Sequence, residues 1–207
     1  MLCQDHRKEL LRFLLIKTAA VRRGEKPAEL LRVPQCYRRT LGDGGREFCL
    51  RQREVLRFLR LEFRILKREP HSALVLFHAP EALRKVLAER AVRGFLSRRG
   101  YPSGPDIDPV LARLESEFAA GGFPHEIGVF LGYPLKDVAG FLHREQLRPV
   151  CRGDWQVFGN PERSLRLMRR YRFWESFAAR IIGECRDLES CLERIAAAPA
   201  PAEVAVL

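Results

Sequence analysis

The sequence predicts an α/β (α+β) protein: a mostly helical single domain around a short, three-stranded sheet, ending in a long C-terminal helix. Apolar residues recur at helical spacing along most of the 207 residues. A few short segments, above all the apolar run 72–77, instead have the length and composition of buried strands. Residues 1–196 are expected to form the globular domain, and residues 197–207 a disordered Ala/Pro-rich tail.

The first sixty residues are expected to be largely helical. Leucines at helical spacing predict a helix over residues 5–23, which a glycine ends. A short second helix is expected over residues 26–31, because a proline would occupy its first turn. A glycine-rich turn at 41–45 precedes a third helix over residues 47–59.

Two strands and then three helices follow along the chain. Residues 63–67 and 72–77 are close enough for a hairpin, and the continuous apolar run of the second is typical of a central strand. Helices are expected from Pro80 to about Arg90, in a segment that ends before Gly100, and over residues 108–119.

The last third is expected to hold a helical pair, a strand and a long helix. The pair covers residues 125–131 and 134–144, with a turn at Gly132. Residues 155–158 are the expected third strand. Asn160 can cap the final helix, which should run to about Ala196.

The net charge of +11 favours an acidic protein partner or nucleic acid. Only six of the 37 basic residues are Lys, however, so the bias also fits a genome rich in arginine codons. The N-terminus lacks an apolar signal core and no segment is long enough to span a membrane, so a cytoplasmic location is expected. The six cysteines form no C-x-x-C pair, and no metal site is predicted.

Motifs of the common phosphate-cofactor and hydrolase classes are absent from the sequence. The Gly-rich segment 42–45 is neither a Walker loop nor a dinucleotide fingerprint, because no Gly-Lys-Ser/Thr follows and no strand precedes it. There is no G-x-S-x-G elbow and no kinase set. Whether the protein is an enzyme is therefore left open.

Two segments resemble a bacterial family called domain of unknown function 3793. They are GFPHEIGVFLGYPLKDVAGF, residues 122–141, and CRGDWQVFG, residues 151–159. Residues 24–30 match part of the family's N-terminal signature, but Thr18 stands where the family has a cysteine. The resemblance implies a cytoplasmic protein of anaerobic bacteria, encoded near flavodoxin-like genes, and implies no particular reaction.

His125, Glu126, Cys151 and Trp155 are the candidate site residues. A histidine at a helix start can ligate a metal, donate to a substrate oxygen or relay a proton, but it can equally fix a loop. Trp155 could form an aromatic wall for a flat cofactor or could belong to the core. Arginines on both sides could lower the pKa of the Cys151 thiol.

The leading hypothesis is a protein that binds a cofactor, a metal or an acidic, flavodoxin-like redox partner in anaerobic metabolism. The identity of any cofactor is left open. One alternative is a basic nucleic-acid-binding protein that uses residues 125–144 as a helix-turn-helix, in which Lys136 is the single outward donor. A second alternative is an interaction scaffold without chemistry.

Overall fold

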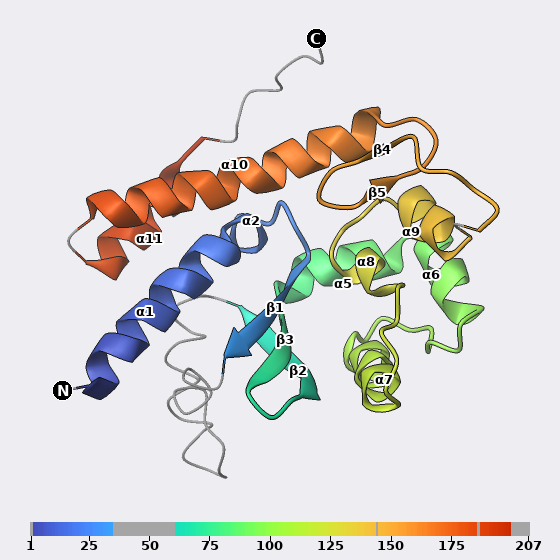
Figure 1. The fold of residues 1–207 in the computed structure, drawn as a ribbon, viewed down its shortest axis with the longest axis horizontal. Helices are drawn as coiled ribbons and strands as arrows, with labels where there is room; N and C mark the ends of the chain where they lie inside the picture. The colour runs from blue at the N-terminus through green and yellow to red at the C-terminus, as the bar shows by residue number, and fades with distance from the viewer. Residues whose placement is uncertain (1, 35–60, 144, 186, 200–207) are drawn as a thin grey trace.

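A computed structural model describes residues 2–34, 61–143, 145–185 and 187–199. Its main sheet has three antiparallel strands, β1 (Ala28–Pro34), β2 (Glu62–Arg68) and β3 (Ser72–His78), in the order β1-β3-β2 (Figure 1). Every residue of β3 is buried. The predicted hairpin and its apolar central strand are confirmed.

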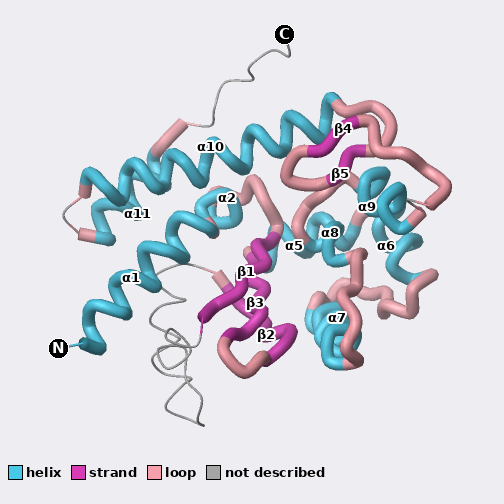
Figure 2. The backbone as a smooth tube through the Cα atoms, viewed as in Figure 1, coloured by secondary structure: helices cyan, strands magenta, loops and turns pink. Residues whose placement is uncertain are grey.

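Helices cover both faces of this sheet, so that the strands form the middle of three layers (Figure 2). Successive residues of β3 point to opposite faces, as they must in an extended strand. Val75 and Phe77 enter one apolar cluster, whereas Leu74 and Leu76 enter the other. Burial on both faces explains why this strand is apolar throughout rather than alternating.

One layer consists of helices from the two ends of the chain. These are α1 (Leu2–Lys17), α2 (Ala19–Arg22), α10 (Glu162–Glu184) and α11 (Leu188–Ala197). Trp174 is fully buried at the centre of this layer. The N-terminal helix is confirmed, with a break at Thr18.

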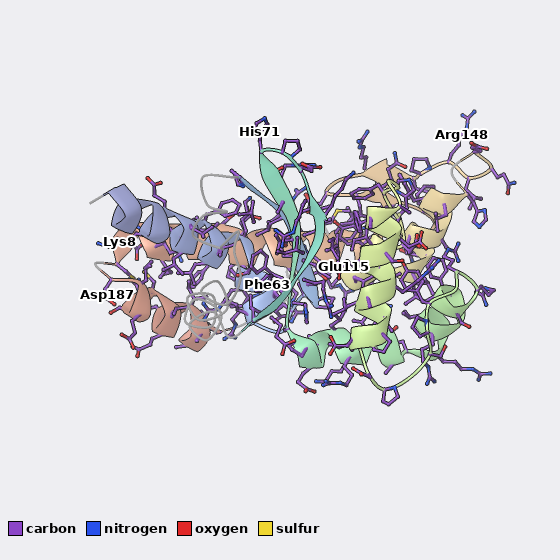
Figure 3. The ribbon with its side chains drawn as sticks, turned by 90° about the horizontal axis from the view of Figure 1, so that it is seen from below. Lys8, Phe63, His71, Glu115, Arg148 and Asp187 are labelled. Carbon is purple, nitrogen blue, oxygen red and sulfur yellow. The ribbon has the colours of Figure 1, made fainter. Side chains whose placement is uncertain are left out.

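The other layer contains the helices between the sheet and the C-terminal part of the chain. They are α5 (Pro80–Ala88), α6 (Arg90–Ser97), α7 (Asp108–Ala119), α8 (Ile127–Phe130) and α9 (Leu135–Leu142). Arg64 of β2 pairs with Asp108 and Glu115 of α7, which lies beside the sheet (Figure 3). The predicted helices in this region, including the short pair around Gly132, are confirmed.

The predicted helix over residues 26–31 is wrong. Residues from Ala28 onward form β1, which pairs with β3 from Ala28↔His78 to Pro34↔Ser72. Leu31 and Val33 join one core, whereas Ala28 and Leu30 pack in the other. Pairing with residues 38 to 50 positions away overrides the local helical signal, and Pro34 is tolerated at the end of an edge strand.

Two further predictions about the C-terminal part are wrong in detail. Residues 155–158 do not join the main sheet: β5 (Gln156–Val157) pairs only with β4 (Cys151–Arg152), and the third strand of the main sheet is β1. The final helix is not continuous to Ala196, because it breaks after Glu184 and α11 starts anew. The Asp187 carboxylate caps α11 by accepting a hydrogen bond from the Ser190 N–H at 2.8 Å.

The remaining predictions of local structure lie largely outside the described residues. These are the turn at 41–45, the helix over 47–59 and most of the tail, of which residues 200–207 are not described. Among the helices that the structure does describe, none is both long enough and apolar enough to cross a membrane.

Candidate ligand-binding site

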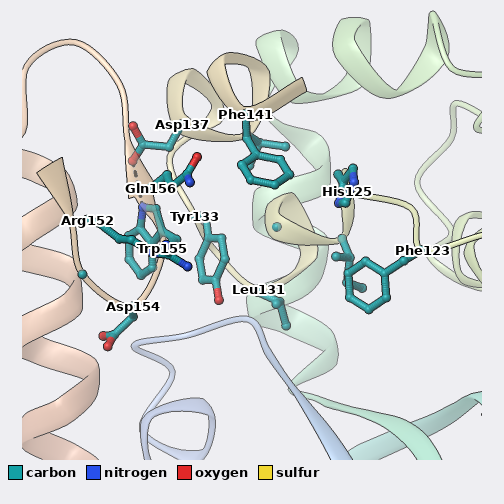
Figure 4. Close-up of a pocket in the computed structure, with 14 residues that line it drawn as sticks. Phe123, His125, Leu131, Tyr133, Asp137, Phe141, Arg152, Asp154, Trp155 and Gln156 are labelled. Carbon is teal, nitrogen blue, oxygen red and sulfur yellow. Dashed lines mark hydrogen bonds between the residues drawn. The ribbon is translucent and has the colours of Figure 1, made fainter. Parts of the chain in front are cut away.

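A cavity of about 320 Å³ lies between the α8–α9 segment and the β4–β5 hairpin (Figure 4). Aromatic and aliphatic side chains predominate in its lining. The lining residues are Phe123, His125, Ile127, Gly128, Leu131, Tyr133, Asp137, Val138, Phe141, Arg152, Gly153, Asp154, Trp155 and Gln156. All of them fall in the two segments that carry the sequence signature.

Aromatic rings stand on two opposite sides of this pocket. On one side Tyr133 and Trp155 stack, with ring centroids 4.2 Å apart and planes at 17°. On the other side the His125 ring meets Phe141 edge to face at 4.8 Å, with Phe123 beside it. Figure 4 shows the space between the two groups. Offset-stacked and edge-to-face rings hold each other's orientation, so both walls are defined.

The indole of Trp155 is held in place by the buried carboxylate of Asp137. The indole N–H donates to this carboxylate at 2.9 Å. The Phe158 N–H donates at 2.9 Å and the Ser164 hydroxyl at 2.6 Å. Lys136 donates to Asp137 at 2.6 Å and to the Phe158 carbonyl at 2.8 Å. The Asp137 carboxylate on α9 therefore connects three parts of the structure: the β5 strand, the start of α10 and the Trp155 side of the pocket.

These hydrogen bonds also decide the charge of Asp137. Burial alone would raise the pKa of its carboxyl group, which is only 2 % exposed. Hydrogen bonds from Lys136, Phe158, Ser164 and Trp155 outweigh burial and hold the pKa below its ordinary value of 3.8. The group is a carboxylate at neutral pH, so it acts as a fixed acceptor.

The N-terminal signature segment meets the central one at Gly132. The backbone of Gly132 has φ +78°, and a Cβ there would lie 2.6 Å from Pro27 Cδ and 2.8 Å from the Tyr171 hydroxyl. Both the left-handed turn and the lack of space require glycine. The Tyr171 hydroxyl donates to the Gly132 carbonyl at 3.3 Å. Pro27 therefore packs against the turn that immediately precedes Tyr133.

A second, smaller cavity of about 170 Å³ lies against the same Tyr133–Trp155 stack. Three ion pairs line it: the largely buried pair of Lys26 with Glu29, and the partly exposed pairs of Lys17 with Glu175 and of Arg172 with Asp154. Burial raises the pKa of Glu29 above its ordinary value of 4.5, although Lys26 opposes the shift. Burial and the carboxylates of Glu29 and Asp154 raise the pKa of Tyr133 to about 12, so its hydroxyl stays protonated.

The structure brings two of the four predicted site residues together at the first pocket. His125 and Trp155 line it from opposite sides. Glu126 does not line it, because its carboxylate accepts a hydrogen bond from Tyr101 at 3.1 Å. Cys151 is half-buried in β4 and does not line it either. His125 precedes a helix of only four residues, so a strong helix-dipole effect on it is not expected.

The geometry of α9 leaves the helix-turn-helix interpretation with little support. Lys136, its single outward donor, gives its hydrogen bonds to Asp137, Phe158 and Ser164. Gly140, on the same helix, is buried against the Phe158 ring. The face that would read bases therefore packs against the β4–β5 hairpin.

Thr18, the position at which the sequence resemblance led us to expect a cysteine, lines neither of the two cavities. It is fully buried, and its hydroxyl donates to the Leu14 carbonyl at 2.6 Å. A threonine hydroxyl that donates to a carbonyl of its own helix has its hydrogen-bond partner within that helix. At this position the side chain therefore serves the packing of α1 and α2.

Asp137, Tyr133 and Arg152 are the site residues that the sequence reasoning missed. A signal existed for Asp137, because it is an acidic residue inside an apolar helix, where an unpaired charge would be costly. Nothing in the sequence indicates that Tyr133 stacks on Trp155, since this contact depends on how the hairpin folds back. Across the described residues, no three His, Cys, Asp or Glu side chains gather into a potential metal site.

Fold and site together define a three-layered α+β protein with a small pocket walled by aromatic residues. Residues 14–192 match the family described as protein of unknown function DUF3793, so the chain belongs to that family. No curated protein matches the chain, and no solved structure does.

Proposed function

We propose that this protein binds a small planar organic molecule, a cofactor or a metabolite, between His125 and Trp155. The single observation that carries the proposal is how Trp155 is held. Its half-buried indole is stacked on Tyr133 and hydrogen-bonded to a buried carboxylate, yet it faces a cavity rather than the centre of a core.

The cost of this arrangement supports a role in binding. Taking the Asp137 carboxylate out of water costs several kcal/mol, on the order of what its hydrogen bonds and the partly exposed Lys136 ammonium return. A fold that needed only stability would gain as much from apolar residues at the positions of Asp137 and Ser164. The network does something that apolar residues cannot do: it fixes the indole in one orientation. Walls fixed in advance lower the entropy that is lost when a ligand binds.

The size of the pocket limits the ligand. Sites for small molecules usually measure roughly 300–1,000 Å³, and this one, at about 320 Å³, lies at the lower end. One ring or two fused rings would fill it. The aromatic sides favour a flat molecule, because ring stacking contributes about 0.5–1.5 kcal/mol per pair beyond the burial of area.

The test is to purify the protein without oxygen from a native or related host and to identify what it carries. We expect a planar compound at close to one equivalent, seen by absorption and by mass spectrometry after denaturation. Trp155→Leu should lose it. Phe173→Leu is the matched control, because this aromatic residue is exposed on α10 outside the pocket and should leave the bound compound unchanged.

Protein that carries no compound, and that gives no heat on titration with one- and two-ring aromatic compounds, would exclude this function. Urea unfolding of both variants separates loss of binding from loss of folding. A metal detected in place of a chromophore would contradict the planar ligand.

Charge favours a second proposal, an acidic protein partner such as a flavodoxin. Residues 143–172 hold eight arginines and three acidic residues, a balance of +5 within the chain's +11. Exposed arginines of this segment, such as Arg163 and Arg169, would steer an acidic partner at low ionic strength. We expect binding to flavodoxin to weaken with salt and with the double substitution of Arg163 and Arg169 by Gln. No binding at low salt would exclude this partner.

A further inference from the structure

We infer that the ligand of this pocket carries an acidic group and that Arg152, together with Gln156, binds it. This inference rests on the proposed function and adds the chemical class of the ligand: a planar molecule of one or two rings with a carboxylate.

The pairing of the hairpin places the two side chains side by side. Arg152 of β4 and Gln156 of β5 are direct partners across the two strands. Directly paired residues project to the same face of a sheet. Both side chains line the pocket, on the Trp155 side, opposite His125 and Phe141 (Figure 4). A guanidinium and an amide N–H group next to each other are donors suited to a carboxylate.

Arg152 is the charged residue of the pocket lining that has no counter-ion among the described residues. Two carboxylates line the pocket, but cations outside its lining hold both. Asp137 is paired with Lys136 at 2.6 Å. Asp154 accepts hydrogen bonds from the Arg172 guanidinium at 2.6–3.1 Å. Among the described residues no carboxylate forms a salt bridge with the exposed Arg152, and Asp137 and Asp154 are each balanced by another cation, so the pocket presents a net positive charge at this end.

The opposite end of the pocket has a different chemistry. His125 there is surrounded by the rings of Phe123 and Phe141. A ligand that places its ring system between these residues and Trp155 would direct an acidic substituent to the β4–β5 hairpin. The other exposed arginines of residues 143–172 add to the same positive potential, which raises the local concentration of anions.

Naphthalene-2-carboxylate and its neutral amide, 2-naphthamide, form the test pair. They share ring and shape and differ in the charge of one substituent. By calorimetry at low salt, we expect the wild-type protein to bind the carboxylate about tenfold more tightly, as for one hydrogen-bonded charge contact. Arg152→Gln should remove this preference and leave the affinity for the amide unchanged. Arg152→Lys should keep part of it.

Arg169→Gln is the matched control, because Arg169 is exposed on α10 and does not line the pocket. It should retain the full preference for the carboxylate. Equal affinity of the wild type for both compounds would refute the inference that the ligand is acidic. It would leave the proposed site for a planar ligand unaffected. Binding of neither compound would overturn both. A preference that falls as much in Arg169→Gln as in Arg152→Gln would assign the effect to general surface charge and refute the role of Arg152.

Discussion

Asp137 organises the candidate site more than any residue that touches the open part of the pocket. Its two oxygens accept hydrogen bonds from an indole, a hydroxyl, a backbone N–H and an ammonium group. The donors come from α9, the β4–β5 hairpin and the first turn of α10. This buried acceptor is costly to alter, because the indole of Trp155, the Ser164 hydroxyl and the Phe158 N–H would lose the partner that they have inside the protein.

Asp137→Asn should therefore destabilise the protein by about 3 kcal/mol, since an amide offers one acceptor oxygen and turns its N–H groups toward donors. Urea unfolding followed by circular dichroism measures the change. Asp154→Asn is the control: Asp154 is exposed, and its pair with Arg172 should contribute at most about 1 kcal/mol. Equal losses in the two variants would show that the hydrogen-bond network has no special role.

At the scale of elements, the close approach of α9 to the hairpin defines one wall of the pocket. Gly140 makes this approach possible, because a Cβ there would overlap the Phe158 ring. Phe158 is buried directly after β5, and its N–H is one of the donors to Asp137. The absence of a side chain at Gly140 thus allows the hydrogen bonds that fix Trp155.

Gly140→Ala should destabilise the protein by about 1–3 kcal/mol, because Phe158 would have to leave its position. Gly94→Ala, inside α6, should instead stabilise it by about 0.5–1 kcal/mol through helix propensity, since only the end of the Arg98 side chain lies nearby, at 3.6 Å. Thermal and urea unfolding of the two variants show whether each substitution stabilises or destabilises the protein. A gain in Gly140→Ala would mean that α9 and the hairpin are not in close contact.

At the scale of the whole molecule, one central strand joins two helical layers. At the end of this strand, His78 is 2 % exposed, and its Nδ1 has no hydrogen-bond partner among the described residues. Burial, reinforced by the charge of Arg64 and opposed by Asp108, lowers the pKa of His78 from 6.5 to about 4. The folded protein therefore keeps this imidazole neutral where an unfolded chain would protonate it.

The stability of the protein should consequently fall as the pH falls from 6.5 to about 4. In this window the unfolded state binds the His78 proton and the folded state does not, so the free energy of unfolding decreases, by up to about 3 kcal/mol. The contribution is complete above pH 6.5. Urea unfolding at several pH values measures this slope.

His78→Gln should flatten the pH dependence over this window, because glutamine does not titrate. His71→Gln, at the exposed tip of the β2–β3 hairpin, should leave the slope as it is (Figure 3). If the slope survives in His78→Gln, another group is responsible for it.

The sequence by itself determined the fold class, the β2–β3 hairpin and most helix positions, because these follow from local apolar periodicity and turn residues. It also marked the two segments that enclose the pocket and two of its residues, His125 and Trp155. Tertiary structure alone decided that residues 28–34 form a strand, that β5 pairs with β4, and that Asp137 holds Trp155. The physical reason is that strand pairing and buried hydrogen bonds join residues far apart in the chain. The local propensity of a segment does not indicate which distant segment it will contact.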